Sequence, residues 1–195
     1  QGMTDVERYA IDQYLMRGGA VIAAAGNYKL TIDQMTGGPA LESIEGGLRD
    51  LLTGYGVFVE ESVVMDQQNE PFPMTVNRQV GDYAVQEIQA LDYPYFVDIR
   101  QDGMADSPIV SNLSAVTMQW ASPGVADEAE NADRDVTILL QSSPSSWVSS
   151  DTTIQPDFEI SETGFVVGSE QRSYPLAVSV QGVFESYFKG QLSPF

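Results

Sequence analysis

Residues 4–25 read TDVERYAIDQYLMRGGAVIAAA, and this stretch decides the fold class that the sequence predicts. Thr4 and Glu7 have the spacing of a capping box, and apolar residues recur after them at helical intervals. The helix is expected to end at the glycine pair 18–19, because glycine permits a left-handed backbone at a helix C-terminus. Residues 20–25 (AVIAAA) then form an apolar run without polar alternation, which is typical of a strand covered on both faces.

The same order of helix, glycine and strand returns further along the chain. Residues 41–55 carry apolar side chains at helical spacing, and residues 57–59 and 62–65 are rich in valine, which predicts a helix followed by strand. Two such modules in succession are typical of a parallel α/β sheet. The sequence therefore predicts an α/β fold with a partly parallel sheet flanked by helices, in which residues 20–25 and 57–64 are neighbouring parallel strands. Because the first helix has no strand before it, we expect the natural domain to begin further upstream.

The second half of the chain predicts a β-rich organisation with antiparallel or mixed strands. Residues 66–80 contain two prolines and two asparagines, and they predict a long ordered loop. Residues 142–150 are rich in serine, but Pro144 and Trp147 favour a packed loop over a flexible one. Four segments with apolar alternation predict strands, at residues 93–99, 115–120, 135–141 and 174–184.

Charge and missing residue types exclude several classes of function. The 195-residue chain carries 28 acidic and 9 basic residues, which gives a net charge of −19. This charge repels phosphate backbones, so no nucleic-acid partner is expected. Histidine and cysteine are both absent, which excludes Ser-His-Asp and Cys-His catalysis, thiol redox chemistry and the usual zinc, haem and iron–sulfur sites. We expect no cofactor.

Residues 1–3 resemble the remnant of an affinity-tag cleavage site, and residues 4–195 are expected to form a single domain. A chain of this size can build its core without disulfide bonds. It contains no run of eighteen uncharged apolar residues, so any membrane-spanning segment is expected to lie outside this sequence.

Polar side chains that follow two of the predicted strands are the candidate ligand-binding residues. Because ligands bind at the carboxyl ends of strands in open α/β sheets, these side chains could hold a polar ligand such as a glycan or a peptide. A structural reading stays open for each, since asparagine and glutamine often satisfy a loop backbone and tryptophan often covers the edge of a core. The candidates are Asp66, Gln67, Asn69, Glu70, Ser142, Ser143 and Trp147.

Neither the acidic run at residues 127–135 nor any pair of carboxylates carries a specific signature. Alternate residues from Asn131 to Asp135 have the spacing of calcium-loop ligands, but Val136 stands where such a loop requires glycine. A solvated acidic loop is therefore favoured there, and no metal site is predicted. Two carboxylates could still act together in a glycan hydrolase, because the 28 acidic residues offer many pairs.

Short phrases spread over the chain carry a family resemblance through their order and spacing. They are residues 10–19 (AIDQYLMRGG), 47–52 (GLRDLL), 55–57 (YGV), 64–69 (VMDQQN), 93–97 (YPYFV), 107–110 (SPIV), 139–143 (LLQSS) and 175–178 (PLAV). Together they resemble the extracytoplasmic domain of the GldG-like, gliding-motility-associated auxiliary components of ABC transporters. The resemblance covers about residues 4–190.

The resemblance implies a membrane-tethered protein that works beside an ABC permease and ATPase. Its soluble part would lie outside the cytoplasm, on the periplasmic or cell-surface side. The implied fold is similar to class I glutamine amidotransferase-like or flavodoxin-like α/β domains, without an established enzymatic activity. No catalytic residue is carried over, and the nucleophilic cysteine of true amidotransferases has no counterpart here.

The leading hypothesis is a non-catalytic binding or scaffolding domain of an ABC-type transport system, which holds a polar ligand or docks transporter partners. The alternative is a carboxylate-dependent glycan hydrolase. A deep cleft with two acids whose pKa values are pushed apart would favour the hydrolase. A purely structural spacer is the third hypothesis, and a surface without a pocket or a large apolar patch would favour it.

Overall fold

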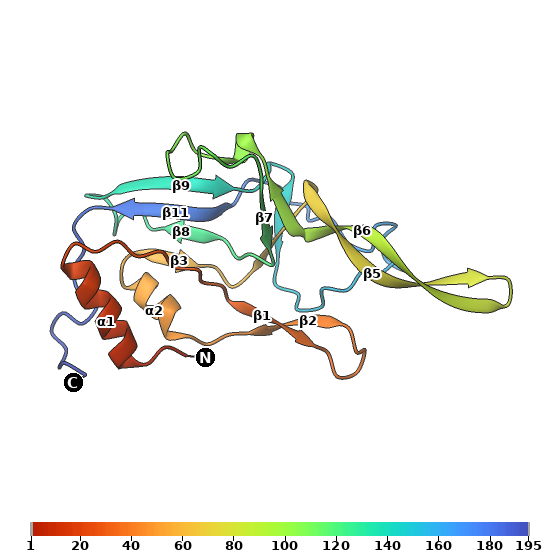
Figure 1. Ribbon diagram of the computed structural model, residues 1–195, viewed down its shortest axis with the longest axis horizontal. Coiled ribbons are helices and arrows are strands. Elements are labelled where there is room, and N and C mark those ends of the chain that lie inside the picture. The colour runs from red at the N-terminus through yellow and green to blue at the C-terminus, as the bar shows by residue number, and fades with distance from the viewer. Residues whose placement is uncertain (1, 195) are drawn as a thin grey trace.

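Figure 1 shows the computed structural model, which describes residues 2–194 as a β-rich body with a long two-stranded arm. The helices are α1 (Asp5–Met16), α2 (Gly47–Thr53) and the short 3-10 helix η1 (Gln101–Gly103). The strands are β1 (Tyr28–Ile32), β2 (Pro39–Ser43), β3 (Val57–Val59), β4 (Val63–Asp66), β5 (Asn69–Val80), β6 (Tyr83–Ile99), β7 (Val116–Gln119), β8 (Gly124–Ala126), β9 (Asp135–Gln141), β10 (Ser146–Ser149) and β11 (Pro175–Gln181).

Every strand pair in residues 2–194 is antiparallel, so the predicted partly parallel α/β fold is wrong. Strand accounts for 38% of the residues and helix for 11%, which makes this a mainly β fold and not a flavodoxin-like one. Four two-stranded sheets pair β1 with β2, β3 with β8, β4 with β10 and β9 with β11. A three-stranded sheet has the order β5-β6-β7. Strands predicted in the second half of the chain do form, as β6, β7, β9 and β11.

Helix α1 forms where the sequence predicts it. The Glu7 carboxylate accepts a hydrogen bond from the Thr4 backbone N–H at 2.8 Å, and the Glu7 backbone N–H donates to the Thr4 hydroxyl at 3.3 Å. These two bonds are the predicted capping box, which satisfies backbone donors that a helix start leaves open. Over the part of the chain that the structure describes, no helix has the length and apolarity needed to cross a membrane.

The apolar run at residues 20–25 is not a strand, which corrects the key step of the fold prediction. It is a connection between α1 and β1 without turn or bend, its side chains from residue 20 to residue 24 are exposed, and Ile22 is fully exposed. Strands β3 and β4 pair with β8 and β10 and not with this run. An apolar run becomes a covered strand only where other strands flank it, and none in the described residues does.

The second predicted helix is shorter than its apolar pattern indicates. Pro39–Ser43 forms β2, a hairpin partner of β1, and only Gly47–Thr53 is helical. Leu41, which the helical pattern includes, is 5% exposed and packs in the core from a strand. Tertiary packing overrides the local pattern here, as is common for a short amphipathic segment.

Strand β5 occupies the segment for which the sequence predicts a long loop. It pairs with β6 from Pro71 opposite Asp92 to Val80 opposite Tyr83. Because β5 has a single neighbour, its prolines can lie where their missing N–H would face away from β6. Residues 71–92 extend from the body as a two-stranded ribbon, here called the arm (Figure 1).

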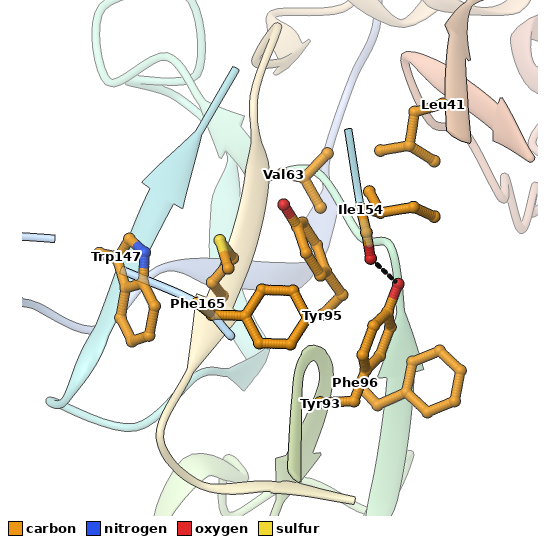
Figure 2. Close-up of a cluster of buried hydrophobic side chains, with 9 residues drawn as sticks. Leu41, Val63, Tyr93, Tyr95, Phe96, Trp147, Ile154 and Phe165 are labelled. Carbon is orange, nitrogen blue, oxygen red and sulfur yellow. Dashed lines mark hydrogen bonds between the residues drawn. The ribbon is translucent and has the colours of Figure 1, made fainter. Parts of the chain in front are cut away.

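Two clusters of buried apolar side chains hold the body together, and β4 separates them because its successive side chains point to opposite faces. The first cluster is rich in aromatic rings, and Figure 2 shows the Tyr93 hydroxyl donating to the Ile154 carbonyl, at 2.8 Å. Its members are Leu41, Val63, Met65, Tyr93, Tyr95, Phe96, Trp147, Ile154 and Phe165. The second cluster comprises Val64, Val97, Ile99, Val110, Leu140, Tyr174 and Leu176.

Helix α1 is fixed to the body through the buried carboxylate of Asp12. Its Oδ1 accepts hydrogen bonds from the Tyr55 hydroxyl at 2.8 Å and the Tyr187 backbone N–H at 2.7 Å. Its Oδ2 accepts a hydrogen bond from the Ser186 hydroxyl at 2.7 Å. Burial by itself would raise the pKa of Asp12, but these donors outweigh burial and hold the pKa below its ordinary value. Burial, together with the neighbouring carboxylate, raises the pKa of Tyr55.

Candidate functional site

The two segments of predicted ligand-binding residues lie side by side, one after β4 and the other after β9. Asp66 Oδ1 accepts hydrogen bonds from the Ser143 hydroxyl at 2.6 Å and the Gln68 backbone N–H at 2.9 Å. Asp66 Oδ2 accepts one from the Ser143 backbone N–H at 2.7 Å. Asp66 is fully buried. The fold thus joins two candidates that are 77 residues apart in the sequence.

Asn69 binds the loop that carries it. Its amide nitrogen donates to the Asp66 carbonyl at 3.0 Å and to the Gln67 carbonyl at 3.1 Å. Its amide oxygen accepts a hydrogen bond from the Tyr93 backbone N–H at 2.8 Å. The side chain of Asn69 therefore ties the start of β5 to β6, while Gln67 is exposed.

Ser142 is buried, and its hydroxyl also bonds within the protein. Its Oγ lies 2.6 Å from the Ser146 Oγ and accepts a hydrogen bond from the Tyr174 backbone N–H at 2.8 Å. The Ser146 hydroxyl donates to the Arg172 carbonyl at 2.6 Å. These bonds link the turn between β9 and β10 to the segment before β11.

The Trp147 side chain points to the other face of the β4–β10 pair from Asp66. It is 4% exposed on β10, where it faces Met65 across the pair with β4, and it belongs to the first core cluster. Figure 2 shows its ring beside the Phe165 side of that cluster. In this position its ring offers almost no surface on which a ligand could stack.

A small surface cavity lies beside the Asp66–Ser143 contact. Its volume is about 140 Å³, and its wall includes Gln68, Arg100, Asp102 and the serines 142 and 143. Because one water occupies about 30 Å³ in the liquid, the cavity holds a few waters or a small polar group. Two of the predicted residues, Ser142 and Ser143, line it directly.

Arg100, which the sequence analysis does not single out, is the main charged group at this cavity. It forms ion pairs with Asp98, at 2.5 Å, and with Glu70, at 3.4 Å. Asp98 is 5% exposed, and its second oxygen has no hydrogen-bond partner in residues 2–194. A basic residue directly after an apolar strand, in a chain with only nine basic residues, is the signal that could have identified it.

Neither a carboxylate pair nor a metal cluster marks the cavity wall. Asp102 is the acidic residue among its lining side chains. The described part of the chain holds no group of three or more histidine, cysteine, aspartate or glutamate side chains that could bind a metal ion. In the acidic run, Asn131 is buried and donates to the Gly56 carbonyl at 2.8 Å, so it fixes the loop to the end of α2.

A wider hollow lies between the arm and the segment around Phe158. Its volume is about 610 Å³, and it is open to solvent. Arg78 and Glu87 of the arm line it and form an ion pair at 3.6 Å, and Glu162 lies on the opposite side. The hollow contains mixed charges and no concentrated apolar or catalytic group.

The chain matches a known family in sequence, and no match was found in structure. The model of the family described as ABC-type uncharacterized transport system matches residues 1–195. Neither a curated protein nor a solved structure matches the chain.

Proposed function

The chain belongs to the ABC-type uncharacterized transport system family, whose members are auxiliary components of such systems, and from this premise we propose a docking role. The protein acts as a non-catalytic scaffolding domain on the extracytoplasmic side of the membrane. There, the arm contacts the permease of the same transport system.

The observation that carries this proposal is the exposed apolar surface of the arm. Tyr83 and Ile88 are each 78% exposed, and Val80 and Val85 are also exposed. Val80 lies opposite Tyr83, so these two side chains share one face of the ribbon. Ile88 is an odd number of residues from Tyr83 along β6, so it lies on the other face, and both faces carry apolar side chains. An aromatic and branched aliphatic side chains on a projecting two-stranded ribbon are suited to filling pockets of a partner protein.

The cavity beside Asp66 supports this choice over catalysis. A glycan hydrolase needs two carboxyl groups about 5–10 Å apart across a sugar-sized cleft. The cavity has a volume of about 140 Å³ and a single acidic residue in its wall, Asp102. The hydroxyl of Ser143 and the carboxylate of Asp66 already bond to each other. A small polar ligand at Arg100 is the second candidate function, which the convergence of two predicted segments at this wall favours.

Residues 1–195 contain no cysteine, so a single introduced thiol is unique within them, which the test uses. Tyr83→Cys, in the arm, is compared with Ile109→Cys, a control position that is 62% exposed on the body. Both are placed in the protein as it occurs in its membrane with its permease and ATPase. A crosslinker that alkylates the thiol at one end and inserts photochemically into any nearby bond at the other should join the arm variant, and not the control, to the permease.

The control variant tests the side of the membrane. A membrane-impermeant maleimide should label the Ile109→Cys thiol in intact cells. Labelling only after permeabilisation would contradict the extracytoplasmic location. Equal crosslinking from the two positions, or none from the arm, would contradict docking through the arm.

A further inference from the structure

The connection between α1 and β1 has an unusual combination of sequence and environment. Residues 20–25 are all apolar, yet residues 20–24 are exposed, with Ile22 fully exposed and Val21 42% exposed. Figure 1 draws this connection as the coil that leaves the top of α1 and crosses to β1. Exposed branched aliphatic side chains in series are typical of a surface that another chain covers.

The backbone of this segment is also unpaired. The N–H and C=O groups of residues 20–26 make no hydrogen bond to any other described residue. Their neighbours do: the N–H of Gly19 donates to the Tyr14 carbonyl at 3.0 Å, and the carbonyl of Asn27 accepts from Ile44 at 2.7 Å. The segment therefore presents a continuous row of free donors and acceptors.

Both ends of the segment are held in place. On one side the α1 C-terminus bonds to Gly18 and Gly19. On the other side Asn27 is 1% exposed, and its amide nitrogen donates to the Val59 carbonyl at 3.0 Å. Because the backbone between these points runs without turn or bend, little further ordering is needed to pair it with a neighbouring strand.

The segment also lacks the features that keep free strand edges from pairing. Free edges usually carry proline, lysine or other charges. The arm follows this rule, with Pro71, Pro73 and Arg78 on β5. Residues 20–25 contain none of these residue types. A strand of this composition is ordinarily covered on both sides.

From these observations we infer that residues 20–26 are an exposed connection that becomes a strand by accepting a β-strand of another protein, that is, by β-augmentation. Unpaired backbone groups select an extended partner, and exposed Val21 and Ile22 select one with aliphatic side chains. Arg17 lies before the segment, while Lys29, beyond its other end, pairs with Glu42 at 3.0 Å. The matching strand is therefore aliphatic in its centre, with an acidic residue at the end that meets Arg17.

A second copy of this chain is a poorer occupant. Each copy carries a net charge of −19, so two copies repel each other. The inference concerns a surface other than the arm, so it stands whether or not the arm contacts the permease.

Amide hydrogen exchange measured by NMR tests the inference, with a capped synthetic peptide of alternating valine and threonine between terminal glutamates. At saturating peptide, the exchange of residues 20–26 should slow about tenfold or more, and the slowed amides should alternate along the segment. Protection of alternate amides indicates strand pairing. Nonspecific binding of a hydrophobic peptide would protect neighbouring amides alike. A version of the peptide with every backbone amide methylated should give no protection.

Two proline variants provide a matched internal control. Ala23→Pro and Ala24→Pro each remove one N–H that is unpaired in the free protein, so both should fold normally, as their melting temperatures will report. One of them should weaken peptide binding at least tenfold more than the other, because a strand on one edge uses alternate N–H groups. Equal effects would overturn the inference.

Three other outcomes would also overturn it. Slow exchange of residues 20–26 in the free, dilute protein would mean that the segment is already paired within the chain. Protection that increases with protein concentration without peptide would identify a second copy as the occupant. Unchanged exchange at millimolar peptide would mean that the segment accepts no strand.

Discussion

Replacing the buried Asp12 by alanine should destabilise the protein strongly. The change removes the acceptor for the Tyr55 and Ser186 hydroxyls and for the Tyr187 backbone N–H. Each stranded buried donor costs about 1–3 kcal/mol. Because breaking a buried charged network typically costs about 3–5 kcal/mol in all, we expect that loss of unfolding free energy for Asp12→Ala.

The assay is urea unfolding followed by tyrosine fluorescence and circular dichroism, with thermal unfolding in parallel. For a chain of this size, the expected loss lowers the melting temperature by roughly 6–20 °C. Glu185→Ala is the matched control, since Glu185 is an exposed acid beside Asp12's partner Ser186 and forms a surface ion pair with Lys189 at 2.6 Å. This control should change the unfolding free energy by less than about 1 kcal/mol.

The pH dependence gives a second readout of the same carboxylate. The pKa of Asp12 is lower in the folded protein than in the unfolded chain, so its ionised form stabilises the fold. This stabilisation is fully present above the unfolded pKa, about 3.9, and is lost as pH falls through the lower folded pKa. Asp12→Asn should therefore show a smaller loss of stability below about pH 4 than the natural protein.

Two results would refute this reasoning. The first is an unfolding free energy of Asp12→Ala, measured in urea, that lies within about 1 kcal/mol of the natural protein's. Three buried donors left without an acceptor should cost more than that. The second is an Asp12→Asn protein whose acid dependence runs parallel to that of the natural protein.

Three further substitutions test other contacts. Asp66→Ala removes both acceptor oxygens of Ser143 and should cost about 2–4 kcal/mol in urea unfolding, whereas a cost near zero would mean that the two loops are held by other contacts. Gly56→Ala places a Cβ 2.7 Å from the Asn131 amide at a φ of +77°, so it should cost more than about 1 kcal/mol in the same assay, and an unchanged midpoint would contradict the predicted strain. Thr4→Ala removes the capping box and should cost about 1 kcal/mol, with Thr4→Ser retaining most of the stability.

Local patterns predicted those elements whose cause is local. The capping box of Thr4 and Glu7 fixes where α1 begins, and both partners lie within one turn of helix. Apolar alternation predicts both β7 and β9 as strands, and in β7 it also identifies the partly buried face, that of Val116 and Met118. In β9 it does not, because Val136 and Ile138 are exposed. The membership in an ABC-transport auxiliary family could also be predicted from the sequence. Such a resemblance rests on the order of short sequence phrases and does not depend on which strands pair.

Strand pairing could not be predicted, because its cause is contact between segments far apart in the sequence. Residues 20–25 have the composition of a covered strand, but composition does not say whether another strand arrives beside them. Likewise, Pro71 and Pro73 indicate a loop, and only the single-neighbour position of β5 makes them compatible with strand. Leu41 fits a helical apolar pattern but lies in a strand, because there its side chain packs in the first core cluster.

The candidate site divides along the same line. Charge, the absence of histidine and cysteine, the helix start and the alternating strands follow from residue types and short-range spacing, so they are legible in the chain itself. Three features depend on contacts between distant segments: Asp66 bonds to Ser143, Trp147 is buried, and Arg100 lines the cavity. Such contacts arise only when the whole chain folds, because each requires a partner that local sequence does not specify.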